Sequence, residues 1–177
     1  MVDNEIKQNW EIILIDDGST DKSLEALQIE VTGFSNMKII QLQRNYGQTA
    51  AISSGIDNAT GDILVTMDAD LQNDPSDIPS LIKKLEQGFD VVSGWRKNRK
   101  DNYFTRILPS KIANWIISKI SDVPLHDYGC SLKVYKMDII KTIKLYGEMH
   151  RFIPIYVAWQ GGKVAEIPVK HHARIHG

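Results

Sequence analysis

The sequence predicts an α/β fold, with a mostly parallel central sheet covered by helices on both faces. Short runs of Ile, Leu and Val alternate with helical stretches through the first half of the chain. This alternation is typical of parallel strands joined by helical crossovers. Two of the runs end in aspartate, and open α/β sheets bind ligands beyond the carboxyl ends of their strands. We therefore expect one domain over residues 1–177, with a site at that edge.

Composition limits the classes of function. A length of 177 residues is enough for one hydrophobic core, and a net charge of -1 gives no general attraction to nucleic acid. One cysteine, Cys130, excludes an internal disulfide and fits a reducing compartment. No apolar run approaches the roughly 20 residues that span a bilayer, and no signal peptide is evident. We expect a soluble, cytoplasmic chain that does not bind nucleic acid.

The first half can be divided by its turn and cap residues. Ser19, Thr20 or Asp21 can cap the first helix, and Gly88 can end a later one. The expected elements are, in order, strand 11–17, helix 22–30, strand 38–42, small-residue helix 47–58, a strand from 63 into an acidic pair, helix 75–87 and strand 90–93.

The second half is less regular. A long amphipathic helix covers 103–121, and Pro109 is expected to break or offset it near its start. The remaining expected elements are loop 125–131, strand 132–135, helix 137–145, helix 150–159 and strand 163–169. The basic end, residues 171–177, has no core pattern and is expected to be a flexible tail rather than a histidine metal site.

The apolar strand from Ile63 ends in two carboxylates, Asp68 and Asp70. Residues i and i+2 of an extended chain point to the same side, so we expect both to project beyond the strand. Carboxylates held this close repel each other, and a divalent cation neutralises them. The alternative is that one aspartate caps the next helix and the other is solvated.

Two further motifs follow strand ends. In Asp16-Asp17-Gly18-Ser19, the glycine lets a ligand approach the backbone, and a carboxylate can accept from a base imide or a ribose hydroxyl. Before the small-residue helix, Arg44 and Gly47 form a helix N-terminus that suits a phosphate. A plain turn with a capping residue is the alternative for each motif.

Arg96 and Asp127 complete the candidate site. Arg96 ends another strand and can balance a diphosphate, while Asp127 lies in a glycine-framed loop and can act as a base or position an acceptor. The basic residues after Arg96 can meet a phosphorylated acceptor or anionic lipid head groups, or form a solvated charge run. Cys130 is interpreted as a small buried residue, because no Cys-His arrangement accompanies it.

Four motifs, in this order, resemble family-2 inverting glycosyltransferases. They are Ile-Asp-Asp-Gly-Ser-Thr-Asp (15–21), Arg-Asn-Tyr-Gly-Gln (44–48), Met-Asp-Ala-Asp-Leu-Gln (67–72) and His-Asp-Tyr-Gly-Cys (126–130). The resemblance runs from about residue 10 to the end and is greatest to polyprenyl-phosphate glycosyltransferases of the dolichol-phosphate mannose synthase type. It implies a nucleotide-sugar-binding fold of the GT-A type and a membrane-associated role in cell-wall or glycoconjugate synthesis, at the cytoplasmic face of the membrane.

The resemblance also implies roles for individual residues. Asp17, with Gly18 and Gly47, would bind the nucleotide-sugar, and Asp17 would contact its base. Asp68 and Asp70 would serve the ribose and a diphosphate-bound Mg²⁺ or Mn²⁺, with Gln72 near the metal. Arg96 would bind phosphate, and Asp127 would lie on the acceptor side of the site. Arg174 would lie in a loop that closes over the donor or the acceptor phosphate.

The sequence departs from the family at both ends. Relatives begin with a further strand ending in Pro-x-Tyr-Asn-Glu-like residues, and they continue into amphipathic or membrane helices. Both parts are expected to be missing here, which would expose a sheet edge and encourage self-association. The donor could be of the UDP-glucose or GDP-mannose type. The alternatives are a binding module without turnover, transfer to a saccharide hydroxyl and an Asp-x-Asp phosphohydrolase, which Gln72 disfavours.

Overall fold

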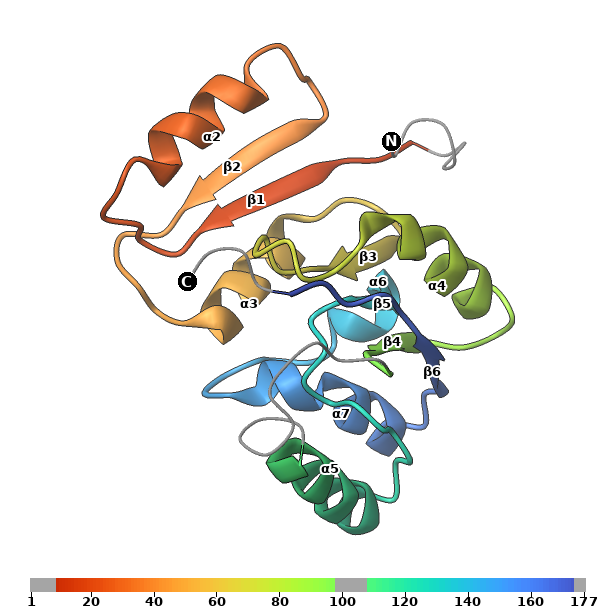
Figure 1. Ribbon diagram of the computed structural model, residues 1–177. Helices are drawn as coiled ribbons and strands as arrows, with labels where there is room; N and C mark the ends of the chain where they lie inside the picture. Colours follow the sequence, from red (N-terminus) through yellow and green to blue (C-terminus); the bar gives the residue numbers. More distant parts are fainter. Residues whose placement is uncertain (1–8, 98–107, 174–177) are drawn as a thin grey trace.

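A computed structural model describes residues 9–97 and 108–173 (Figure 1). The strands are β1 (Ile12–Asp16), β2 (Met37–Gln41), β3 (Ile63–Thr66), β4 (Val91–Trp95), β5 (Lys133–Lys136) and β6 (Val164–Pro168). The α-helices are α2 (Ser23–Val31), α3 (Gln48–Asn58), α4 (Ile78–Leu85), α5 (Leu108–Ser121), α6 (Met137–Ile140) and α7 (Ile153–Trp159). Two 3-10 turns, Pro75–Asp77 and Met149–Phe152, lead into α4 and α7.

The strands form two sheets. β1 and β2 pair in parallel, and β3, β5, β4 and β6 form a four-stranded sheet in that order. β5 is antiparallel to both of its neighbours, whereas β4 and β6 are parallel. Three of the four strands therefore run in one direction, as expected, and β5 is reversed. The reversal follows from the connection, because the chain enters β5 at the edge where β4 ends, with Gly94 N donating to Leu132 O.

Helices cover both faces of the four-stranded sheet (Figure 1). On one face, Leu81 and Leu85 of α4 pack with the buried residues Val92, Leu132 and Val134. A second cluster joins β4 and β5 to α3, α6 and α7; its fully buried members include Val91, Tyr135, Ile140 and Val157. Ile13 of β1 and Ile52 of α3 pack against this second cluster, so α3 links the two sheets. This arrangement confirms the expected α/β layers.

Two sequence-based expectations are corrected. The expected break or offset at Pro109 stays a prediction, because residues 98–107 are not described; Pro109 is the second residue of α5 as described, and the first turn of a helix needs no amide donor there. The helix expected over 137–145 ends at Ile140, where Thr142 N donates to Ile139 O in a tight turn. The C-terminal end is not wholly a loose tail, since His171 is buried and forms a β-bridge with Asn73.

The long helix expected over 103–121 ends at Ser121, as expected. Its described part is α5, and residues 103–107 lie outside the described ranges. In the described part of the chain, no helix is both long enough and apolar enough to cross a bilayer.

Candidate functional site

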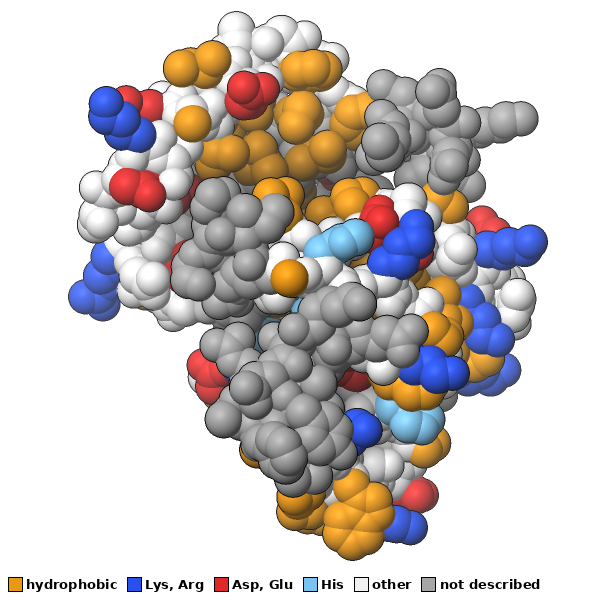
Figure 2. Space-filling view, viewed as in Figure 1, with side chains coloured by type: hydrophobic (Ala, Val, Ile, Leu, Met, Phe, Trp, Pro, Cys, Tyr) orange, Lys and Arg blue, Asp and Glu red, His pale blue; other side chains and the backbone are white. Residues whose placement is uncertain are grey.

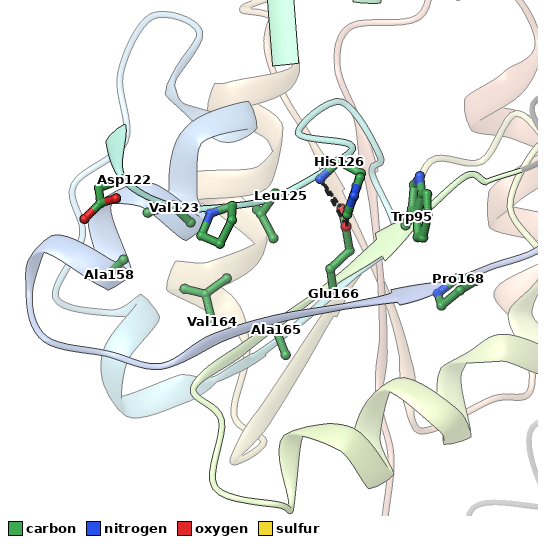
Figure 3. Close-up of a pocket in the computed structure, with 11 residues that line it drawn as sticks. Trp95, Asp122, Val123, Leu125, His126, Ala158, Val164, Ala165, Glu166 and Pro168 are labelled. Carbon is green, nitrogen blue, oxygen red and sulfur yellow. Dashed lines mark hydrogen bonds and ion pairs between the residues drawn. The ribbon is translucent and has the colours of Figure 1, made fainter. Parts of the chain in front are cut away.

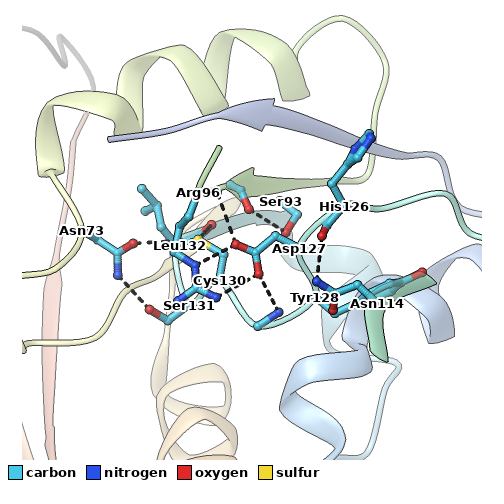
Figure 4. Close-up of polar contacts among 12 residues, drawn as sticks. Asn73, Ser93, Arg96, Asn114, His126, Asp127, Tyr128, Cys130, Ser131 and Leu132 are labelled. Carbon is cyan, nitrogen blue, oxygen red and sulfur yellow. Dashed lines mark hydrogen bonds and ion pairs between the residues drawn. The ribbon is translucent and has the colours of Figure 1, made fainter. Parts of the chain in front are cut away.

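The acidic loop after β3 contacts two other elements. Asp68 follows the strand end and accepts a hydrogen bond from Gln48 Nε2, in the first turn of α3, at 2.7 Å. The backbone amide of Asp68 donates to Ser131 Oγ at 3.3 Å. Asn73 Nδ2 donates to the same hydroxyl at 2.9 Å. Ser131 therefore joins the Asp68–Asn73 loop to the loop that carries Asp127 (Figure 4).

A strained turn follows Asp70. Leu71 has a φ of 63°, a left-handed conformation that is uncommon for a branched side chain. The turn brings Gln72 N to Asp70 Oδ1 at 3.1 Å. Gln72 is in turn held by the C-terminal segment, because His172 N donates to Gln72 O at 2.9 Å and Gln72 Nε2 donates to His172 O at 3.4 Å. Hydrogen bonds to Asp70 and to His172 thus fix the position of Gln72.

Arg96 and Asp127 form a bidentate ion pair (Figure 4). Arg96 Nε lies 2.7 Å from Asp127 Oδ2, and Arg96 Nη2 lies 2.9 Å from Oδ1. The backbone amide of Arg96 also donates to Oδ2, at 3.2 Å. The two side chains are only 15% and 5% exposed. A paired guanidinium of this kind is held in one orientation, which suits recognition of a phosphate.

A buried acid of β6 positions the loop before Asp127. Glu166 accepts from the backbone amide of Asp127 at 2.9 Å and from that of His126 at 3.1 Å. Its Oε2 lies 2.8 Å from His126 Nδ1, and the His126 ring stacks on Trp95 with centroids 4.3 Å apart. These residues line one side of a cavity of about 430 Å³ (Figure 3). Glu166 was not singled out from the sequence, although an acid within an apolar strand was a usable signal.

A buried lysine lies close to the ion pair. Lys133, the first residue of β5, is 3% exposed and donates through Nζ to the carbonyls of Tyr128 and Cys130. Burial lowers the pKa of Lys133, while the negative charge of Asp127 opposes that shift. Burial also raises the pKa of the Cys130 thiol to about 11. Cys130 is therefore a protonated core thiol, which agrees with its interpretation as a buried residue.

A buried histidine borders α3. His150 Nδ1 lies 2.7 Å from the hydroxyl of Thr49, in the first turn of α3, and both residues are buried. Burial is the largest cause that lowers the pKa of His150, and the Arg151 charge adds to it. A largely neutral imidazole follows, because both causes disfavour its charged form. In the sequence, His150 is only the start of the helix expected over 150–159 and has no assigned role.

The loop after β1 is held by its own carboxylates. Asp17 Oδ1 and Oδ2 accept from the amides of Tyr46 and Gly47, at 2.8 and 2.9 Å, so this side chain fixes the start of α3. Asp16 is 3% exposed, and its Oδ2 has no hydrogen-bond partner among the described residues. Gly18 has a φ of 74° and packs against Arg44 and its neighbour. The close approach that Gly18 permits is thus within the chain, and the ligand contacts of Asp17 and Gly18 stay predictions.

Gly18→Ala is expected to lower the free energy of unfolding by about 2 kcal/mol. A Cβ at this position would lie 2.5 Å from backbone atoms of Arg44 and Asn45, in addition to the cost of the left-handed φ. The matched control is Gly33→Ala, where φ is 95° and no atom lies within 4 Å of the added Cβ. Urea unfolding of both variants measures the difference. Equal losses would contradict the packing role of Gly18.

The structure links several of the residues expected from the sequence. Ser131 joins the loop that holds Asp68 and Gln72 to the loop that carries Asp127, and Asp127 pairs with Arg96. The C-terminal segment also holds Gln72. Gly47 lies at the start of α3 with a φ of 92° and open space beside it. Arg174 lies outside the described residues, and its role stays a prediction.

Comparison with known proteins identifies the family. A family model described as glycosyl transferase family 2 matches residues 1–144, which is most of the chain. The chain belongs to glycosyltransferase family 2. A relative named dodecaprenyl-phosphate galacturonate synthase, from Rhizobium johnstonii, is 54% identical over 95% of this chain and 51% of its own length. An undecaprenyl-phosphate 4-deoxy-4-formamido-L-arabinose transferase from Salmonella choleraesuis is 44% identical over 97% of this chain and 53% of its own.

Solved structures establish the GT-A fold of this family-2 chain. Glucosyl-3-phosphoglycerate synthase from Mycobacterium tuberculosis matches 94% of this chain and 62% of its own, with a TM-score of 0.70 and 15% identity. A mannosyltransferase from Pyrobaculum calidifontis, solved with GDP-Man and Mn²⁺, matches 89% of this chain and 45% of its own, with a TM-score of 0.64 and 18% identity. The chain spans about half the length of the curated relatives it matches.

Proposed function

We propose that this protein transfers a sugar, with inversion, from a nucleotide-sugar to a polyprenyl phosphate at the cytoplasmic face of a membrane. The observation that carries the proposal is that Ser131 joins the acidic loop to the loop that carries Asp127. The backbone amide of Asp68 and the side chain of Asn73 donate to Ser131, and Asp127, in the loop before Ser131, pairs with Arg96 (Figure 4). A donor diphosphate with its metal and an acceptor phosphate need charges of opposite sign within one site.

The relatives support a polyprenyl phosphate as the acceptor. Dodecaprenyl phosphate and undecaprenyl phosphate stand in the names of the two relatives described above. A phosphate is already ionised near neutral pH, so it can attack without a strong general base. Asp127 fits this case, because both of its oxygens accept from Arg96. Transfer to a saccharide hydroxyl would instead require Asp127 to leave that pair and take a proton.

The acidic loop suits a divalent cation. Asp68 and Asp70 offer carboxylate oxygens, which Mg²⁺ and Mn²⁺ prefer. No group of three or more His, Cys, Asp or Glu that could hold a metal occurs in residues 9–97 and 108–173. Two carboxylates fit an ion that is bound partly by a substrate diphosphate. When bound, the ion would neutralise charge that develops on the leaving nucleoside diphosphate.

The chain's own residues supply binding and orientation. Gln48 holds Asp68, and the left-handed turn at Leu71 holds Asp70 against Gln72. Arg96 is fixed by Asp127, and its positive charge suits an acceptor phosphate. Fixed groups stabilise charge without reorganising during the reaction, and this preorganisation accounts for much of enzymatic rate enhancement.

Donor binding tests this proposal. Calorimetric titration with Mn²⁺ and a panel of nucleotide-sugars, including UDP-glucose, GDP-mannose and a UDP-uronic acid, is expected to give one metal-dependent donor. Asp70→Asn is expected to weaken its binding by about 10- to 100-fold, because the metal loses a charged ligand. Asp57→Asn, an exposed acid on α3, is the control and should bind normally. Binding that survives both EDTA and Asp70→Asn would contradict the metal site.

Turnover separates the enzyme from a binding module. Radiolabelled sugar should pass from the selected donor to undecaprenyl phosphate in the presence of Mg²⁺ or Mn²⁺. Donor binding without transfer to any polyprenyl phosphate would favour the binding module, and release of inorganic phosphate without sugar transfer would favour a phosphohydrolase.

A further inference from the structure

Lys133 is a lysine inside the core. Lysine and arginine side chains usually lie on the surface, and Figure 2 shows several of them over and around α4, at the right of the view. Lys133 is instead 3% exposed, at the start of β5. It pairs with Thr66 of β3 and with Ser93 of β4, close to where those strands end. Burying a lysine is costly unless its donors are used, so its contacts indicate its role.

The amine of Lys133 bonds the loop that carries Asp127. Lys133 Nζ donates to the carbonyl of Tyr128, at 3.2 Å, and to the carbonyl of Cys130. Between these two carbonyls, the amide of Gly129 donates to Asp127 Oδ1 at 3.2 Å. Lys133 and Asp127 therefore hold successive peptide groups in the middle of the same loop.

The two ends of this loop, residues 126–131, are held by other side chains. Glu166 accepts from the amides of His126 and Asp127 at one end. At the other end, Thr66 Oγ1 donates to Ser131 O at 2.8 Å. Each residue from 126 to 131 thus has a backbone group bonded to a side chain. Lys133 supplies the bonds at the centre.

The centre of the loop lies against the ion pair of the candidate site. A Cβ added at Gly129 would lie 3.2 Å from Arg96 Nη2, so the backbone here is close to the guanidinium. A shift of this segment would disturb Arg96 and also the amide that donates to Asp127. Displacements of about 1 Å at a reacting site can reduce a rate by about 100-fold.

We infer that Lys133 is a positioning residue, which holds the centre of loop 126–131 so that Arg96 and Asp127 keep the orientation needed for transfer. This inference rests on the proposed function, which places both residues on the acceptor side. The competing explanation is that Lys133 only stabilises the fold. Lys133→Met separates the two, because methionine is also unbranched but donates no hydrogen bond. Removing a desolvated lysine offsets part of the loss of two hydrogen bonds, so this variant should fold.

Hydrogen exchange of backbone amides tests the inference without turnover. In Lys133→Met, the amide of Gly129 should exchange roughly tenfold faster or more, while the amides of β5 keep their protection. Equal acceleration of both would mean that Lys133 supports the whole fold, and it would overturn the inference. Lys136→Met is the matched control, because it makes the same substitution at the other end of β5, in a more exposed ion pair with Asp90. It should leave the exchange of Gly129 unchanged.

A second variant keeps the test decisive if Lys133→Met does not fold, which circular dichroism would reveal. Lys133→Gln retains an N–H donor for one of the two carbonyls. The amide of Gly129 should then exchange faster than in the unmodified chain but more slowly than in Lys133→Met. Normal exchange in a folded Lys133→Gln, together with normal kcat, would overturn the inference.

Turnover is measured with a short, water-soluble isoprenyl phosphate and the donor selected by calorimetry. In Lys133→Met, kcat should fall about 100-fold, and KM for the donor should stay within about threefold of normal. Glu166→Gln acts on the same loop, so the double variant should lose less than the product of the two single losses. Losses that multiply would overturn the inference. Absence of transfer in the unmodified chain would count against the proposed function alone, and the exchange of Gly129 would still decide the role of Lys133.

Discussion

Asp127→Ala is expected to reduce transfer about 1,000-fold and to lower the free energy of unfolding by about 3–5 kcal/mol. The substitution removes the partner of Arg96, whose side chain is only 15% exposed. Removing one member of a buried pair is costly because the other charge stays desolvated. Transfer falls as well, since Arg96 loses the contacts that fix its orientation.

The control for Asp127→Ala is Lys136→Ala, which breaks the more exposed ion pair with Asp90. An exposed pair contributes about 0–1 kcal/mol, so urea unfolding should show a much smaller loss. Arg96→Lys gives a second comparison, because it keeps the charge and loses the bidentate geometry. Normal transfer by Arg96→Lys would contradict the orienting role of the pair.

Glu166→Ala is the second substitution expected to have a large effect, on both stability and kcat. The carboxylate of Glu166 is 7% exposed and accepts from the amides of His126 and Asp127 and from the His126 ring. Without it, two amides lose their acceptor, at an expected cost of about 2–4 kcal/mol in the free energy of unfolding. The loop that carries Asp127 should then lose its fixed position, and kcat should fall about 100-fold.

Glu166→Gln separates positioning from packing. Glutamine has nearly the same shape and keeps one acceptor oxygen, so stability should fall by only about 1 kcal/mol while kcat still drops. Donor affinity, measured by calorimetry, should be unchanged because the acidic loop after β3 is not touched. A loss of donor affinity equal to the loss in kcat would mean that Glu166 supports the whole fold rather than the acceptor side.

Much of the fold could be predicted from the sequence because several of its strands are short apolar runs. The apolar runs of β1 and β3 and the small residues of α3 indicate both the type of each element and its order. The reversed direction of β5 could not be read from its residues, since an apolar strand has the same pattern in either direction. The early end of α6 was missed because apolar residues continue to Leu145 after the helix has ended.

Only part of the candidate site could be predicted, because some of its residues have a recognisable pattern in the local sequence and others do not. Asp68, Asp70 and Arg96 each follow the end of a strand, which can be recognised in the local sequence. The sheet then brings these strand ends together at one edge. Glu166 acts through contacts with a loop that is distant in the sequence, and Lys133 donates to the carbonyls of Tyr128 and Cys130 just before it. No sequence motif marks either residue. The buried position of His171 depends on a bridge to Asn73, nearly 100 residues earlier in the chain. Such partners become visible only in three dimensions.

The bridge between His171 and Asn73 has a mechanical consequence. The chain at residues 171–172 is hydrogen-bonded to the same short loop that contains Asp70 and Gln72. A displacement of the chain just after His172 should therefore reach the acidic loop directly through these hydrogen bonds, without passing through the core. We expect the two segments to move together, so that a ligand bound to one of them changes the geometry of the other.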